Sequence, residues 1–154
     1  MTPSAAGDTP SAVDFYILRD PTPRGRLRFA CRLVEKAFSA GHRIYLHCHD
    51  EMSVQQLDDE LWRFRQGSFL PHQSSLNGTD PETPIHIGCD DRVGPHYDLL
   101  INLSDSTPPE AARYQRLAEL VSGSEASKAA ARQRYRAWRE AGWPLRNHDI
   151  EMTS

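Results

Sequence analysis

A stretch near the carboxyl end of the chain has the charge and spacing to bind a negatively charged ligand. Residues 128–146 hold six of the chain's 18 basic side chains and one of its 21 acidic ones, leaving 12 basic and 20 acidic residues elsewhere. Arg132, Arg136 and Arg139 are spaced i, i+4 and i+7 with Tyr135 beside them, so a helix would place these side chains on one stripe. Guanidinium groups hold carboxylates through paired hydrogen bonds, and an aromatic ring adds apolar contact. The stripe fits an acidic, partly apolar ligand, although a solvated helix face has the same pattern.

Length and composition indicate one soluble globular domain. The chain has 154 residues, of which 38% are hydrophobic and 25% charged. No apolar run approaches the roughly 20 residues of a membrane span, so we expect no membrane partner. Residues 1–12 lack the features of a signal peptide and are interpreted as a disordered tail. Three cysteines without CxxC spacing favour a reducing compartment, which indicates a cytoplasmic protein.

The order of expected elements predicts a parallel sheet. Apolar runs rich in strand formers lie at 13–18, 43–48, 84–88 and 97–103; helices are expected at 24–40, 52–64, from 108 to about 121, and from beyond Gly123 to 142. Gly41 ends the first of these helices and Asp50 caps the second. Alternating strands and helices require right-handed crossovers between parallel strands. Residues 65–84 are turn-rich and are expected to form a long surface loop. The predicted fold is a three-layer, Rossmann-like α/β domain with a mostly parallel sheet flanked by helices.

The motifs that would support catalysis or a cofactor are missing from the sequence. The turn after the first strand, residues 19–25, contains one glycine and two prolines, and the chain contains neither GxGxxG nor GxxxxGK[ST]. Residues 47–50, His-Cys-His-Asp, are the best metal candidate, but they have no second tight pair of ligands. The acids at 58–60 are expected on a solvated helix face. We therefore expect no metal, no cofactor and no catalysis; the alternative is a small α/β enzyme acting on a phosphorylated or nucleotide ligand.

Two aromatic residues could contact a second protein. Trp62 ends the second helix and Phe69 lies in the loop seven residues later. An aromatic side chain on a loop is a plausible docking hot spot. The other interpretation is that both rings fold back onto the core, as most aromatic side chains do. On residue type alone the second interpretation is favoured.

Several motifs, in this order and spacing, resemble those of the chi subunit of bacterial DNA polymerase III. The resemblance covers about residues 13–143, and the extensions at 1–12 and 144–154 show no match. Residues 144–154 are therefore expected to form a C-terminal tail. The segments that carry the resemblance are FYIL at 15–18, LDDELW at 57–62, SFLPH at 68–72, DLLINL at 98–103 and ARQRYRAWREAG at 131–142.

The resemblance implies a non-catalytic accessory protein of the replisome. Chi proteins bind the acidic C-terminal tail of the single-stranded-DNA-binding protein and bind the psi subunit, which connects them to the clamp loader. By residue matching, tail binding falls on Arg132, Tyr135 and Arg136, with Val121 as an apolar neighbour; the family commonly has lysine where Arg136 stands. Matched to the same family, Trp62 and Phe69 would dock psi or an alternative helicase partner.

DNA itself is expected to be contacted only indirectly. The net charge of -3 argues against binding nucleic acid with the whole surface. Direct binding of single-stranded DNA by the basic helix is disfavoured because that mode combines several stacking aromatics with a long basic groove. The helix offers mainly Tyr135 and Trp138, and Trp138 is expected to turn into the core.

Overall fold

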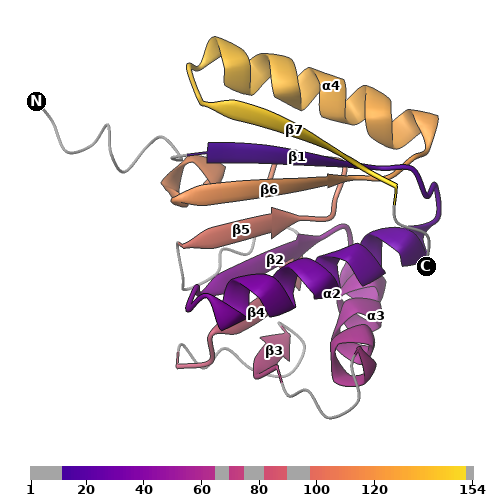
Figure 1. Cartoon of the computed structure of the whole chain (residues 1–154), viewed down its shortest axis with the longest axis vertical. Coiled ribbons are helices and arrows are strands. Elements are labelled where there is room, and N and C mark those ends of the chain that lie inside the picture. The colour runs from indigo at the N-terminus through magenta and orange to yellow at the C-terminus, as the bar shows by residue number, and fades with distance from the viewer. Residues whose placement is uncertain (1–11, 65–69, 75–81, 90–97, 152–154) are drawn as a thin grey trace, which may run out of the picture.

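Within the part of the chain that the structure describes, seven strands, all parallel, form one central sheet (Figure 1). The structure is a computed structural model and describes residues 12–64, 70–74, 82–89 and 98–151. The strand order is β3-β4-β2-β5-β6-β1-β7. In chain order the elements are β1 (Ala12–Leu18), α2 (Pro23–Ser39), β2 (Ile44–Cys48), α3 (Glu51–Arg63), β3 (His72–Ser74), β4 (Ile85–Cys89), β5 (Leu99–Asn102), the 3-10 turn η1 (Ala111–Arg113), β6 (Arg116–Val121), α4 (Glu125–Glu140) and β7 (Leu145–Ile150).

Helices cover both faces of this sheet and create two separate cores. Side chains alternate along a strand, so Ile44 and Leu46 of β2 enter the core beneath α2 and α3, whereas Tyr45 enters the core beneath α4 and η1. Trp138 of α4 is buried in the second core, as expected, with its ring centroid 5.8 Å from that of Phe15. The predicted three-layer α/β fold is confirmed.

Local sequence signals set the helix boundaries. Asp50 caps α3 as expected, because its carboxylate accepts a hydrogen bond from the Ser53 N–H at 2.8 Å. Ser124 caps α4 in the same way, accepting from the Ser127 N–H at 3.2 Å. Gly41 ends the α2 segment with φ at 90°, a backbone conformation that glycine adopts without strain.

The prediction of a helix over 108–121 is wrong. This region forms the short turn η1 followed by strand β6, which lies between β5 and β1 and pairs with both. Its buried side chains alternate between the two cores: Ala118 and Leu120 face α2, whereas Leu117 and Val121 face α4. A strand buried on both faces is nearly continuously apolar, and over six residues that pattern is difficult to separate from a helix by periodicity.

Two segments expected to lack regular structure contain strands. The expected loop over 65–84 includes β3, which pairs with β4; the described part of that loop is 70–74 and 82–84. The expected tail over 144–154 includes β7, which pairs with β1 along its whole length and extends the sheet. Half of the β7 side chains are exposed, so the strand has little apolar signal in the sequence.

The expectation that residues 58–60 form a solvated face is wrong for Asp58. This carboxylate is 8% exposed, and its Oδ1 lies 3.2 Å from His72 Nε2. The other ring nitrogen of His72 lies 2.6 Å from the Leu70 carbonyl oxygen. The imidazole therefore connects segment 70–74 to α3, and this partner, distant in the sequence, explains why Asp58 faces inward.

Candidate functional site

A groove runs between helix α4 and the end of the sheet formed by β6, β1 and β7. Its volume is about 370 Å³. Strand side chains and Ala131 form an apolar floor, while the rim on α4 carries Lys128 and Arg132. The lining consists of Phe15, Ile17, Val121, Lys128, Ala131, Arg132, Tyr135 and Asn147.

Three of the four residues expected to bind an acidic tail line this groove together. Val121 closes one end of its floor from β6, whereas Arg132 and Tyr135 face it from α4. Arg136 is exposed on α4 but does not line the groove. The structure adds Lys128, which is four residues before Arg132 and seven before Tyr135. That helical spacing was available in the sequence and could have identified Lys128.

The strand residues of the groove had no comparable signal in the sequence. Phe15 and Ile17 alternate along β1 and point toward α4, and Asn147 comes from β7 on the neighbouring strand. The Phe15 and Tyr135 rings pack with their centroids 5.2 Å apart. Asn147 reaches the groove because β7 pairs with β1, a pairing that joins residues more than 130 positions apart.

A buried ion pair determines which face of helix α4 is exposed to solvent. Arg134 donates from Nε to Glu119 Oε2 and from a terminal nitrogen to Oε1, both at 3.0 Å, and Asn102 Nδ2 also donates to Oε1 at 2.9 Å. Burial raises the pKa of Glu119, an effect that the charge and hydrogen bonds of Arg134 oppose. Positions two residues either side of Arg134 are about 200° away around the helix, so Arg132 and Arg136 are exposed to solvent, and Arg132 lies at the rim of the groove.

The cations on the outward face of α4 are available to a ligand. Among the residues that the structure describes, Arg132, Arg136 and Arg139 form no ion pair with an acidic side chain. Lys128 has only an exposed contact with Glu125, at 4.0 Å. A surface pair of this kind contributes little energy and does not neutralise the lysine strongly. The groove therefore combines unpaired positive charge with an apolar floor.

The second candidate surface contains Trp62, which lies on α3, far from the groove in the fold (Figure 1). Its side chain is 59% exposed, so Trp62 does not fold back onto the core as residue type alone favoured. The ring contacts that of His72, with centroids 4.8 Å apart. Phe69, the other residue predicted for this surface, lies outside the described residues.

Comparison with known proteins assigns the family. The family model described as "DNA polymerase III chi subunit, HolC" matches residues 11–146. The chain belongs to the DNA polymerase III chi subunit family. It is 45% identical to the DNA polymerase III subunit chi of Pseudomonas aeruginosa over 138 residues, covering 90% of this chain and 96% of the relative. Subunit chi of Haemophilus influenzae is 30% identical over 137 residues, and that of Escherichia coli 29% over 136, covering 88% and 85% of this chain and 95% and 92% of the relatives.

Membership of the chi family identifies an accessory subunit of the replisome rather than a catalytic one. Burial raises the pKa of Cys31 to about 12 and raises that of Cys48 also, so both thiols stay protonated and unreactive. No group of three metal-binding side chains occurs in the described ranges. None of the described helices combines the length and apolar character needed to cross a membrane.

In this chi-family chain an acidic side chain occupies the position where related folds bind phosphate. Asp20 follows β1 and accepts hydrogen bonds from the N–H and hydroxyl of Thr22, at 2.8 and 2.6 Å. A Cβ added to Gly25 would lie 2.4 Å from the Asp20 carboxylate, so the glycine lets that carboxylate approach the first turn of α2. A phosphate at this helix start would meet a negative charge instead of free N–H groups.

Proposed function

We propose that the groove beside α4 binds the acidic C-terminal tail of the single-stranded-DNA-binding protein. The observation that carries the proposal is the meeting of Arg132, Tyr135 and Lys128 over one apolar floor. A tail that ends in acids, a proline and a phenylalanine presents carboxylates beside an aromatic ring. Charged hydrogen bonds from the α4 rim would hold those carboxylates, and the floor at Val121 would take the ring. A short tail loses conformational entropy when it binds, so we expect micromolar affinity, about -8 kcal/mol.

Replacing Arg132 with alanine is expected to weaken binding of a tail peptide by about 1–3 kcal/mol, because charged hydrogen bonds are lost from the rim of the groove. Arg136→Ala is expected to have a smaller effect, since this side chain does not line the groove. Isothermal calorimetry with a peptide of the tail sequence measures both affinities. Arg63→Ala, which removes a cation from α3, is the matched control and should leave the affinity unchanged.

The experiment can also reject the groove as the binding site. If Arg132→Ala and Tyr135→Ala both bind the peptide as tightly as the unaltered chain does, the tail binds elsewhere. If Arg136→Ala has the larger effect of the two arginine variants, the outward stripe of α4 binds the tail and the groove does not. Affinities should also fall as salt rises, because surface charge pairs are screened.

The exposed α3 surface at Trp62 is proposed to contact a second protein, either the psi subunit of the clamp loader or a helicase partner. Trp62 and Phe69 match the family residues with that role, and the 59% exposure of the indole supports it. Large aromatic side chains commonly dominate protein interfaces. A chain that holds the tail at α4 and the partner at α3 would link the single-stranded-DNA-binding protein to the clamp loader.

Trp62→Ala is expected to abolish co-purification with the clamp-loader partner while affinity for the tail peptide stays unchanged. The physical reason is that the indole is on the surface, so its loss removes interface area and little core packing. Met52→Ala, which removes another exposed apolar side chain from α3, is the control for a general loss of apolar surface. Loss of tail binding in Trp62→Ala would show that the ring supports the fold instead.

A small enzyme acting on a nucleotide or phosphorylated ligand is not favoured. The turn after β1 contains two prolines, which have no N–H group, and holds the Asp20 carboxylate against the start of α2. The three described cysteines are buried, and burial raises the pKa of Cys31 and of Cys48, so these two thiols stay protonated. These two observations remove the phosphate-binding turn and the thiol nucleophile that such an activity would use most readily.

A further inference from the structure

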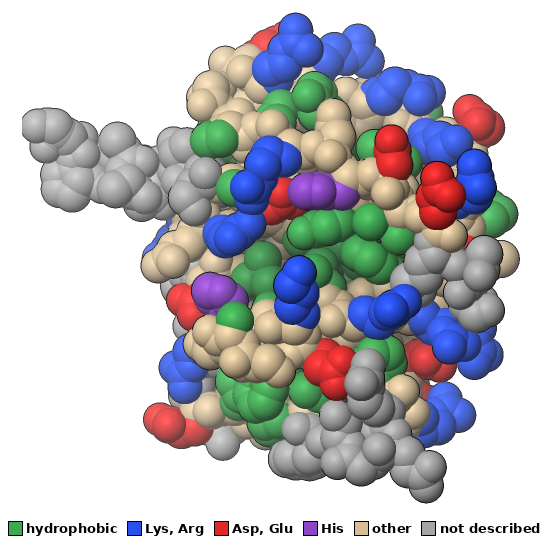
Figure 2. Space-filling view, in the orientation of Figure 1, with side chains coloured by type: hydrophobic (Ala, Val, Ile, Leu, Met, Phe, Trp, Pro, Cys, Tyr) green, Lys and Arg blue, Asp and Glu red, His purple; other side chains and the backbone are tan. Residues whose placement is uncertain are grey.

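The α2 side of the sheet is not fully covered by helices. Helices α2 and α3 pack over β2, β4 and neighbouring strands. Strands β1 and β7 lie to one side of α2 instead of beneath it (Figure 1). Figure 2 shows that this part of the surface is hollowed, with apolar side chains inside and Lys and Arg side chains around them. The hollow has a volume of about 220 Å³. We call it the trough and define it by Tyr16, Leu33, Lys36, His42, Arg116 and Ala118, which line it with Asp14 and Asp98.

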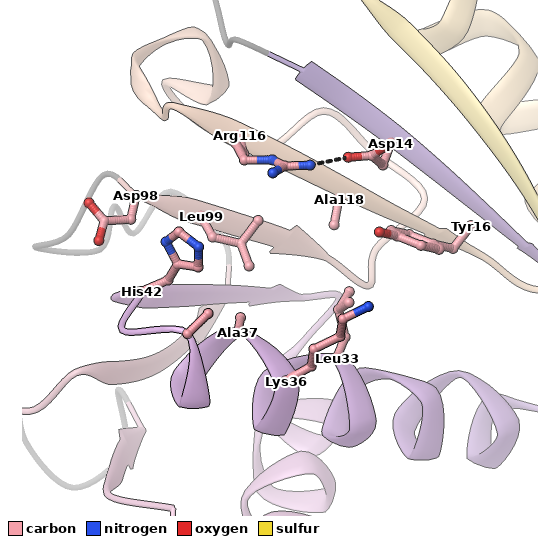
Figure 3. Close-up of a pocket in the computed structure, with 11 residues that line it drawn as sticks. Asp14, Tyr16, Leu33, Lys36, Ala37, His42, Asp98, Leu99, Arg116 and Ala118 are labelled. Carbon is pink, nitrogen blue, oxygen red and sulfur yellow. Dashed lines mark hydrogen bonds and ion pairs between the residues drawn. The ribbon is translucent and has the colours of Figure 1, made fainter.

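The trough lies on the opposite face of β1 from the groove beside α4. Side chains alternate along this strand, so Asp14 and Tyr16 enter the trough whereas Phe15 and Ile17 enter the groove. Figure 3 shows the strand contributions on one side and Leu33 and Lys36 of α2 on the other. The two sites therefore share strands β1 and β6 but no lining residue.

Three rings form a row at the edge of the trough. The centroid of Tyr16 lies 5.3 Å from that of Phe29 and 4.8 Å from that of His148, and the rings of Tyr16 and His148 are stacked with an interplanar angle of 16°. Burial, and then the neighbouring Asp14 carboxylate, raise the pKa of Tyr16, so the phenol stays uncharged. A neutral aromatic surface of this kind can stack with a planar ligand.

Positive charge surrounds these rings on two sides. Arg116 and Arg146 donate to Asp14 at 3.1 and 2.9 Å, yet their side chains remain 45% and 54% exposed, so each guanidinium keeps donors facing solvent. On the other side, α2 carries five basic residues and one acidic residue, and its Lys36 lines the trough. Burial alone would raise the pKa of Asp14, but hydrogen bonds from His148, Arg146 and Arg116 lower it overall.

Both carboxylates of the trough already accept hydrogen bonds. Asp14 accepts from Arg116, Arg146 and His148, and Asp98 accepts from the Arg43 N–H at 2.9 Å. An extended peptide needs acceptors for its own N–H groups, and Asp14, which already has three donors, has little capacity left for them. A phosphodiester strand needs donors only, together with flat surfaces for its bases.

We propose that the trough binds single-stranded DNA. The phosphates would accept hydrogen bonds from Lys36, Arg116 and Arg146, and a base would pack against the aromatic row that Tyr16 centres. The chain belongs to a family of DNA polymerase subunits, for which DNA is a chemically reasonable ligand. The proposal differs from the expectation that DNA is contacted only indirectly, because the aromatic row and the basic rim lie on α2, β1, β6 and β7 rather than on α4. The strand would lie on one face of β1 while the protein tail occupies the other.

The test uses the full chain and a fluorescently labelled oligothymidylate at low salt, with binding followed by anisotropy. Lys36→Glu and Tyr16→Leu are each expected to weaken binding by roughly tenfold or more, through lost phosphate contact and lost stacking. Arg136→Glu, on α4, is the matched control for charge and should change the affinity by no more than about twofold. Thermal melting of each variant shows whether it is folded.

Calorimetry with the acidic tail peptide separates this proposal from the proposed function. Lys36→Glu should bind the peptide normally, because Lys36 does not line the groove. Three results would overturn the proposal: no saturable binding of the oligonucleotide, equal weakening by Lys36→Glu and Arg136→Glu, or loss of peptide affinity in Lys36→Glu with oligonucleotide binding intact. The last result would assign the trough to an acidic peptide.

Discussion

Replacing Glu119 with alanine is expected to lower the free energy of unfolding by about 3–5 kcal/mol, because Arg134 would remain buried without its partner. Glu119 is fully buried and Arg134 is 5% exposed, so water cannot replace the lost carboxylate without opening the core beneath α4. One Arg134 nitrogen, NH1, already has no hydrogen-bond partner among the described residues, which leaves the guanidinium especially dependent on Glu119. Denaturant titration followed by circular dichroism measures the change.

A double variant separates the loss of a partner from the loss of the ion pair itself. With leucine at both 119 and 134 no buried charge is stranded, so most of the lost stability should return. Asn102 would still donate to the Ser106 carbonyl, at 2.9 Å. If the double variant has the same free energy of unfolding as Glu119→Ala, the ion pair itself stabilises the folded chain. Its role would then not be limited to specifying the orientation of α4. Affinity for the tail peptide should fall in the single variant, because Arg132 and Tyr135 depend on that orientation.

The sequence predicted those parts of the fold that local patterns determine. The apolar runs of β1, β2 and β4 and the N-terminal cap of α3 at Asp50 were found because each signal lies within a few residues. Strand β6 was misassigned because its identity depends on neighbours on both sides, β5 and β1, that lie far away in the sequence. Strand β7 was missed for a related reason, since an edge strand exposes half of its side chains and needs only one partner.

The groove could be predicted only in part. The α4 residues follow helical spacing, so Arg132 and Tyr135 could be grouped from the sequence, and the family resemblance added Val121. Arg136 belongs with them by spacing and by family resemblance, and the structure places it on α4, exposed and outside the lining of the groove. The orientation is set by Arg134, which in the sequence is one more basic residue of the stretch. Its inward direction follows from Glu119, fifteen residues earlier on β6.

The trough had a weaker signal in the sequence. Helix α2 carries many basic residues, as α4 does, but its arginines are distributed around a helix whose apolar spacing is typical of a packing element. The aromatic row joins Phe29 on α2, Tyr16 on β1 and His148 on β7, and this combination appears only when β7 is part of the sheet. A site assembled from three elements, one of them unexpected, cannot be found from residue spacing.

Trp138→Ala is expected to destabilise the chain by about 3–5 kcal/mol, the cost of leaving a cavity where a large buried ring stood. The indole is 5% exposed and stacks on Trp143, with centroids 5.3 Å apart, where α4 turns into β7. It also packs against Phe15, whose ring lines the groove beside α4. Trp138 therefore connects the helix that carries the cations to β1 and to the segment that leads into β7, two of the three strands beside the groove.

The same substitution should weaken binding of the tail peptide, although Trp138 does not line the groove. Trp138→Phe fills most of the cavity and should retain much more of both stability and affinity, because packing rather than a polar contact is responsible. Denaturant titration and calorimetry on the two variants measure both quantities. A cost below about 1 kcal/mol for the alanine variant would mean that the region around Trp143 collapses to fill the space. In that case β7 would adapt to α4, and the groove would depend on Arg134 and Glu119 alone for its geometry.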